Sequence, residues 1–161
     1  MNNDKNQVLV SGAVVVRRNK EGDLEWFLTK QVDDGKWEIP KVIVRKGESS
    51  VRAALRVTGE KGGMTTRVLE EAGRAGGVAT VGGKTVSQRY LYYLMLLKAS
   101  SGEPIGFGEC GWFEYPSASK KLSSKRERIM LKQAKEEFVK WKKAREAKRK
   151  KEKQLQQNTS V

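Results

Sequence analysis

The segment from Trp37 to Gly73 constrains the fold of this chain more than any other. An extended WEIPK stretch leads into a KGES turn, and an amphipathic stretch of helix-forming residues follows at positions 49–57. Ser49 or Ser50 can cap this helix, because a serine side chain accepts a hydrogen bond from a free N–H of the first turn. The helix should end at a group of glycines, Gly59, Gly62 and Gly63. The sequence therefore predicts a loop, a short helix and a second loop.

Apolar and alternating stretches on both sides of this segment predict strands. Residues 7–18 and 24–31 flank an NKEGD turn, which predicts a β-hairpin. Residues 37–40 should form a short strand, and residues 78–81 and 87–98 should form buried strands. A second short helix is expected over residues 65–72, with Gly73 as its C-terminal stop. From this pattern alone, the fold class is α/β or α+β.

Glu48 and Arg56 are separated by seven residues within the run KGES…AALR that follows WEIPK. This spacing resembles the first half of the Nudix box, the signature of the Nudix hydrolase family. The box runs G, five residues, E, seven residues, R-E-U-x-E-E-x-G-U, where U is a bulky aliphatic residue. The resemblance implies that Glu48 and Arg56 are structural residues of the box. Val42 stands at the opening glycine, and Val57 stands where the family has a metal-binding glutamate.

The second half of the box matches in either of two registers. Without a gap, Glu60 falls on the first glutamate of the E-E pair, Lys61 on the second and Gly63 on the closing glycine. Lys61 cannot bind a metal ion there, because its ammonium group has no lone pair.

The other register assumes that a glycine-rich insertion interrupts the box helix. Glu70, Glu71 and Gly73 then supply the E-E-x-G ending, and Arg67 stands at the first metal-binding glutamate. We favour this register, because a VxxVGG run follows at about the distance that the family leads one to expect.

Two later segments extend the resemblance over residues 8–138. Glu109 lies three residues before Trp112, as in the late E-x-x-W strand of the family. The run KLSSKRERIMLKQA resembles the closing segment of dinucleoside polyphosphate and diphosphoinositol polyphosphate hydrolases. The implied fold is the Nudix one, a mixed sheet sandwiched between helices, here with a long basic C-terminal helix.

The resemblance implies a site for Mg²⁺ or Mn²⁺, which neutralise phosphate charge and activate water when a phosphoanhydride is hydrolysed. Glu60, Glu70 and Glu71 are the candidate metal ligands. Glu71 is also a candidate catalytic residue, and Glu109 completes the site or acts as base. The candidate substrate-binding residues are aromatic or basic: Trp37, Lys41, Arg45, Lys46 and Tyr90. The alternative is that the glutamates are solvated helix-surface charges and the aromatic residues belong to the core.

Composition sets outer bounds on function. The chain has 161 residues, 33 lysines and arginines against 19 aspartates and glutamates, a net charge of +14, and no histidine. Histidine-dependent acid–base chemistry and histidine-ligated zinc are therefore excluded. Cys110 is the only cysteine, so no intrachain disulfide can form, which fits a reducing cytoplasm. The sequence carries no apolar run long enough to cross a membrane, and we expect a cytoplasmic protein.

A long helix is expected to begin at about Ser124. Its apolar stripe, Met130, Ala134, Phe138 and Trp141, should pack on the sheet or on a partner. The segment KKAREAKRKKEKQLQQ that follows has little to bury. It either binds RNA or another polyanion or is a solvated helical or disordered tail. The expected organisation is a flexible N-terminus (1–7), a Nudix-like domain (8–141) and a basic tail (142–161).

Two hypotheses about function follow. The first is a magnesium-dependent pyrophosphohydrolase of nucleoside diphosphate-linked or dinucleoside polyphosphate substrates. The second is a pseudoenzyme, a Nudix-fold module that binds a nucleotide, RNA or another polyanion without cleaving it. Both predict a phosphate-rich partner and no membrane. The retained Glu48, Arg56 and E-E-A-G run favour the first, whereas Val42, Val57 and Arg67 favour the second.

Overall fold

The computed structural model describes residues 7–30 and 35–159. The predicted N-terminal segment 1–7 lies outside the described residues, apart from Gln7. The elements follow in the order β1 (Gln7–Arg18), β2 (Leu24–Lys30), β3 (Trp37–Glu38), β4 (Lys41–Ile43), α1 (Ser50–Arg56), the π-helix η2 (Val57–Lys61), β5 (Met64–Val81), β6 (Lys84–Ser100), β7 (Glu109–Phe113), α2 (Tyr115–Lys121) and α3 (Lys125–Thr159).

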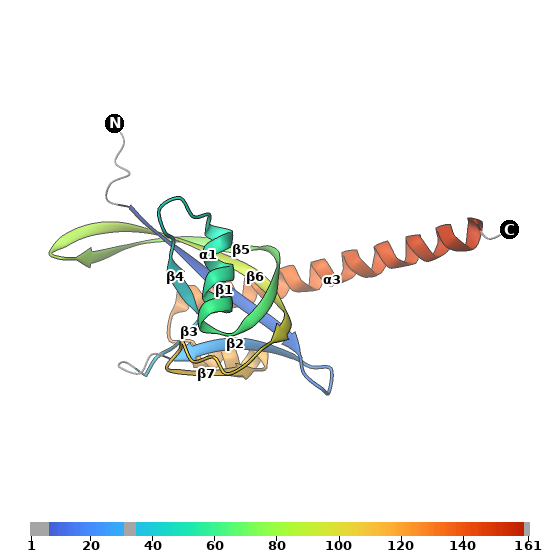
Figure 1. Cartoon of the computed structure of the whole chain (residues 1–161), viewed down its shortest axis with the longest axis horizontal. Helices are drawn as coiled ribbons and strands as arrows, with labels where there is room; N and C mark the ends of the chain where they lie inside the picture. The colour runs from blue at the N-terminus through green and yellow to red at the C-terminus, as the bar shows by residue number, and fades with distance from the viewer. Residues whose placement is uncertain (1–6, 31–34, 160–161) are drawn as a thin grey trace.

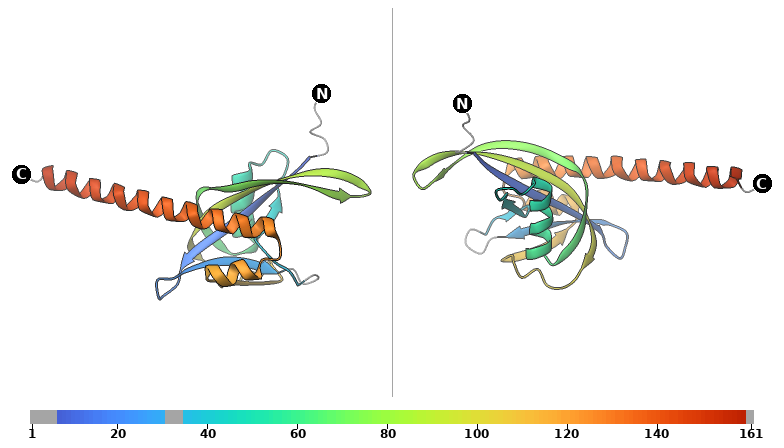
Figure 2. Two further views of the ribbon diagram at one scale, coloured as in Figure 1. Left: turned by 180° about the vertical axis from the view of Figure 1, so that it is seen from behind. Right: turned by 45° about the horizontal axis from the view of Figure 1, so that its top comes forward.

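The strands form one mixed sheet with the order β3-β2-β1-β6-β5, in which β4 also pairs with β1 and β7 with β2. β1 runs parallel to β6 and antiparallel to β2 and β4. The predicted β1–β2 hairpin is confirmed. Helix α1 lies on one face of the sheet and α3 on the other (Figures 1 and 2). The predicted mixed sheet between helices, with a long C-terminal helix, is therefore the observed fold.

Side chains of β1 contribute alternately to two cores, one on each face of the sheet. Val14 and Val16 belong to the core on the α3 side, whereas Ala13 and Val15 belong to the core on the α1 side. A strand that is covered on both faces must be apolar at consecutive positions. This requirement explains the continuous valine run near the start of the chain.

Residues 65–72 form part of strand β5, so the predicted second helix is wrong. β5 pairs antiparallel with β6 along its length, and its burial alternates as a strand requires except where the register shifts. The long pairing with β6 overrides the weak helix propensity of this stretch. Gly73 is therefore no helix stop. A Cβ at Gly73 would lie 2.6 Å from Met130 Sδ, so the glycine allows α3 to approach β5 closely.

The β5–β6 hairpin extends beyond the rest of the sheet (Figure 1). Gly82 and Gly83 form its turn with φ values of +58° and +78°, a conformation that glycine adopts without steric cost. Val78 and Val81 are 72% and 59% exposed, so the predicted burial of residues 78–81 is wrong.

Helix α3 has an inner part that packs on the sheet and an outer part that leaves the domain (Figure 2). Met130, Ala134 and Phe138 are buried in the core, and Trp141 is partly buried against it. From residue 142 to Thr159 the helix continues without interruption and every residue is exposed. Within residues 7–30 and 35–159, no helix is long and apolar enough to span a membrane.

Candidate functional site

The box segment follows the ungapped register. Helix α1 continues directly into η2, and the chain reverses at Gly62 and Gly63 before β5 begins at Met64. Gly63 has a φ of +62°, a backbone conformation that favours glycine, as expected for the closing glycine of the box. No insertion interrupts the helix, so the favoured interrupted register is wrong. Glu60 and Lys61, rather than Glu70 and Glu71, occupy the E-E positions.

The first half of the box is fixed by an ion pair between Glu48 and Arg56. Arg56 Nε donates to Glu48 Oε2 at 2.9 Å, and Arg56 Nη2 donates to Glu48 Oε1 at 3.0 Å. Arg56 also donates to the Ile43 carbonyl, and the Arg45 N–H donates to Glu48. The hydrogen bond from Arg56, followed by that from the Arg45 N–H, lowers the pKa of Glu48 to about 2. The pair joins the loop before α1 to the end of α1.

Serine side chains hold the start of α1 against the sheet. Ser49 Oγ accepts a hydrogen bond from the Arg52 N–H at 3.2 Å, which confirms the predicted cap. Ser11 Oγ on β1 donates to the Ser50 carbonyl at 2.7 Å, and Ser50 Oγ lies 2.5 Å from the Tyr93 hydroxyl on β6. The loop and the helix of the box thus have a fixed position on the sheet.

In the second half of the box, apolar packing stands where the family has a carboxylate. Val57 is 1% exposed and belongs to the core that contains Phe27 and Met64. The loop after β6 lies against the end of η2, where the Gly106 N–H donates to the Lys61 carbonyl at 3.0 Å. Phe107 of the same loop packs against Phe27 with tilted rings whose centroids are 5.7 Å apart.

The predicted carboxylates do not come together as a metal site. Glu60 lies exposed on η2. Glu71 on β5 forms an ion pair with Arg74, and Glu109 on β7 lies 3.7 Å from Lys30. Glu70 is exposed on β5. Across the described part of the chain, no three histidine, cysteine, aspartate or glutamate side chains are grouped so that they could hold a metal ion. This donor set does not fit Mg²⁺, which requires several oxygen ligands in near-octahedral geometry.

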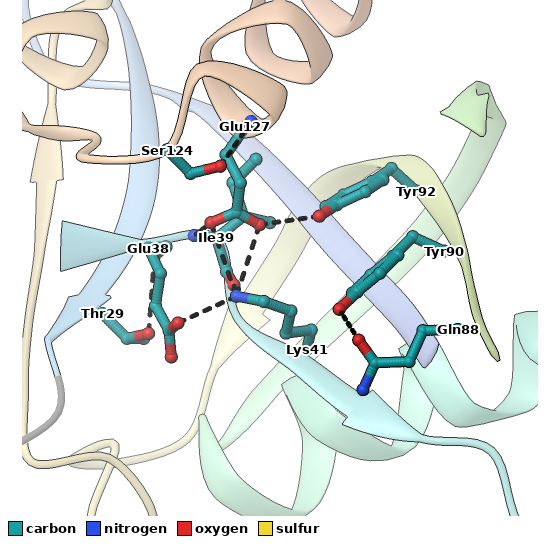
Figure 3. Close-up of polar contacts among 9 residues, drawn as sticks. All are labelled: Thr29, Glu38, Ile39, Lys41, Gln88, Tyr90, Tyr92, Ser124 and Glu127. Carbon is teal, nitrogen blue, oxygen red and sulfur yellow. Dashed lines mark hydrogen bonds and ion pairs between the residues drawn. The ribbon is translucent and has the colours of Figure 1, made fainter. Parts of the chain in front are cut away.

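Lys41, a predicted phosphate ligand, instead belongs to a polar network under α3 (Figure 3). Its Nζ lies 2.9 Å from Glu38 Oε2 and 3.3 Å from Glu127 Oε2. Glu127 is 2% exposed and also accepts from the Ile39 N–H at 2.9 Å and from the Tyr92 hydroxyl at 2.8 Å. Burial, followed by the Glu127 carboxylate, raises the pKa of Tyr92, so the hydroxyl stays a donor. The network fastens the first turn of α3 to the box loop.

The other predicted substrate-binding residues point to separate places. The Trp37 ring meets Phe113 edge-on with centroids 5.1 Å apart, and Lys121 lies over it. Tyr90 is 9% exposed and lies under the Arg126 guanidinium on α3. The remaining two, Arg45 and Lys46, are exposed in the loop before α1. Trp37 and Tyr90 therefore pack in or against the core, as the alternative interpretation expected.

Glu127 is the residue that reasoning from the sequence missed. It is a single acidic residue within the basic run KRER at the start of the predicted C-terminal helix. An acidic residue in a first helical turn is usually explained by the helix dipole, so only the fold reveals its buried partners.

Comparison with known proteins agrees with this geometry. No curated protein matches the chain. The chain is similar to a Caenorhabditis elegans Ap4A hydrolase in a binary complex, at 20% identity and a TM-score of 0.61, covering 82% of this chain and 98% of that one. It is also similar to the NUDIX domain of Shewanella oneidensis NrtR complexed with ADP ribose (17% identity, TM-score 0.61, 82% and 88% covered). A third similar structure is the Escherichia coli dihydroneopterin triphosphate pyrophosphohydrolase (14% identity, TM-score 0.62, 78% and 92% covered).

At these identities the solved structures establish the fold alone, and they do not establish a substrate or an activity. The NUDIX domain family model matches residues 8–141, which is most of the chain. This match, the loop–helix–loop at positions 41–64 and the sheet between α1 and α3 together identify the protein as a member of the Nudix family.

Proposed function

We propose that this protein is a Nudix-fold module that binds a phosphate-rich ligand without hydrolysing it. The carrying observation is the second half of the box, where buried Val57 and exposed Lys61 stand at two of the three metal-binding positions. Glu60 alone supplies a carboxylate there. One carboxylate makes a weak Mg²⁺ site, because the ion retains most of its waters unless several hard ligands or substrate phosphates replace them.

The charge of the chain supports the binding part of this proposal. A net charge of +14 creates a field that attracts polyanions. From residue 142 to 161 the sequence carries eight lysines and arginines against two glutamates. Such a segment binds phosphate groups mainly by releasing counterions, so the affinity should fall steeply as salt rises.

The test of the hydrolytic function combines metal titration with a product assay. Mg²⁺ and Mn²⁺ are titrated calorimetrically into the purified protein, and release of phosphate or nucleotide is then followed with Ap4A, ADP-ribose and nucleoside triphosphates. We expect no saturable metal binding and no turnover. Metal-dependent turnover that is lost in a Glu60→Gln variant but kept in Glu70→Gln would overturn the proposal and establish an enzyme.

The test of the binding function uses inorganic polyphosphate and a chain truncated after Trp141. We expect the full chain to bind polyphosphate with an affinity that falls as KCl rises, and the truncated chain to bind much more weakly. Equal affinity of the two chains would show that the tail takes no part in binding.

A further inference from the structure

A groove with a volume of about 500 Å³ lies between residues 138–149 of α3 and the neighbouring ends of β1, β2 and β6. We call it the α3 groove. Six of its lining residues are basic and one, Glu146, is acidic. The basic residues are Arg17, Arg18, Lys98, Lys142, Arg145 and Arg149. Residues of α3 line this groove, whereas the box helix α1 packs on the opposite face of the sheet.

The positive charge of the α3 groove is only partly balanced within the chain. Arg17 forms an ion pair with Glu25 at 3.0 Å. Within the described residues, Lys142, Arg145 and Arg149 form no ion pair. Their spacing of three and four residues puts them on one face of α3, in line with Phe138. The helix therefore presents a row of cations along one wall of the groove.

The same groove has an apolar and aromatic surface. Leu24, Leu96, Phe138 and Trp141 line it together with the cations. Trp141 stacks on Phe138 with ring centroids 5.8 Å apart, and the Arg145 guanidinium lies 5.2 Å from the Trp141 ring. Trp141 is only partly buried, so its neighbours do not cover the side chain completely. Cations beside an accessible aromatic ring are the combination that binds an unpaired base and its phosphates.

We infer that the α3 groove binds single-stranded nucleic acid, with a base against Trp141 and backbone phosphates on Lys142, Arg145 and Arg149. A duplex presents phosphates but keeps its base faces stacked, so it would use only the cations. Inorganic polyphosphate likewise has no base for Trp141. The inference rests on the binding part of the proposed function, and it does not depend on whether the box hydrolyses anything.

The test measures fluorescence anisotropy of labelled twelve-nucleotide oligo(U) and oligo(dT) with the full chain over a series of KCl concentrations. A groove variant carries Lys142→Gln, Arg145→Gln and Arg149→Gln. A matched control carries Lys143→Gln, Lys150→Gln and Lys151→Gln, which lose the same charge from residues outside the groove lining. We expect the groove variant to bind much more weakly than the control. The slope of log K against log[KCl] should become shallower by about 2, since each phosphate contact contributes about 0.7 on single strands.

A second variant, Trp141→Leu, separates stacking from charge. We expect its affinity for the oligonucleotides to fall by roughly tenfold, the size of one lost base–aromatic stack, while its affinity for inorganic polyphosphate stays unchanged. Thermal unfolding and circular dichroism confirm that each variant remains folded.

Equal losses in the groove variant and the control would overturn the inference in favour of diffuse attraction by the whole tail. An unchanged oligonucleotide affinity in folded Trp141→Leu would overturn the stacking contact. Either result leaves polyanion binding itself intact. If the unaltered chain bound no polyanion at all, the proposed binding function would be wrong too. Metal-dependent turnover would contradict only the proposed loss of hydrolysis.

Discussion

The two halves of the Nudix box are preserved to different degrees in this chain. In the first half and directly before it, buried or half-buried charged side chains have protein partners: Arg56 binds Glu48, and Lys41, which precedes the box, binds Glu127. In the second half, from Val57 to Met64, two of the three positions that bind metal in the family carry a buried valine and an exposed lysine, and only Glu60 is a carboxylate. In this chain the Glu48–Arg56 pair stabilises the loop and the helix whether or not a metal is bound. Metal ligands stabilise nothing without a metal, so packing side chains can replace them.

The largest effect should come from Glu127→Ala, which removes the buried partner of the first half. The variant leaves the Tyr92 hydroxyl and the Ile39 N–H without their acceptor, and Lys41 loses one of its two carboxylate partners. We expect the free energy of unfolding to fall by about 3–5 kcal/mol, the cost of breaking a buried ion pair. Chemical denaturation measures it. Glu137→Ala on the same helix, which removes an exposed pair with Lys140, should change stability by less than about 1 kcal/mol. Similar losses in the two variants would contradict the structural role of Glu127.

The second largest effect should come from Val57→Glu, which restores the family's carboxylate in the second half. Because Val57 is 1% exposed among apolar side chains, we expect a loss of about 2–4 kcal/mol in unfolding free energy. Leu55→Glu, on the same helix and 38% exposed, is the matched control and should cost much less. Recovery of the Val57→Glu variant's stability on addition of Mg²⁺ would show a latent metal site, and the comparison between the halves would then weaken.

The third prediction concerns the pH dependence of the Glu48–Arg56 pair. The folded pKa of Glu48, about 2, lies below its ordinary value of 4.5. Its contribution to stability is therefore complete above pH 4.5 and is lost as the pH falls towards 2. Thermal melts from pH 7 to pH 2 should show a smaller acid-induced drop in Tm for Glu48→Gln than for the unaltered chain. Parallel curves for both proteins would contradict the assigned pair.

The smallest effect should come from the double variant Glu70→Gln, Glu71→Gln. Both residues lie on β5, and the Glu71–Arg74 ion pair is solvent-accessible. We expect stability to change by less than about 1 kcal/mol and Mg²⁺ titrations to be unchanged. If the unaltered chain bound Mg²⁺ saturably and this variant did not, the two glutamates would be metal ligands.

The sequence was sufficient to predict the β1–β2 hairpin, a serine cap at position 49 or 50, and the buried stripe of α3. Each of these follows from local periodicity or from a turn of few residues, so nearby side chains determine it. The second half of the box was mispredicted because its E-E-A-G run resembles a helix ending. Pairing with β6, which lies farther along the chain, decides that residues 65–72 form a strand.

In the candidate site, too, local features were predictable and long-range contacts were not. Glu48 and Arg56 were predicted to be structural residues of the box, and the structure shows that they form an ion pair. The partners of Lys41 and the apolar surroundings of Val57 could not be predicted, because Glu127 and Phe27 come from distant segments. Which side chains meet at a site depends on how the helices and strands pack. This packing cannot be predicted from spacing along the chain.

By itself, the sequence determined the family, the mixed sheet with flanking helices, the excess of positive charge and the absence of histidine. These are properties of composition, periodicity and short spacings. Only the tertiary structure decided that the box is ungapped, that Val57 in its second half is buried among apolar side chains, and that β1, β6 and α3 form a basic groove around Trp141. Strand pairing and helix docking bring together residues that lie far apart in the chain, and long-range contacts of this kind leave no local pattern.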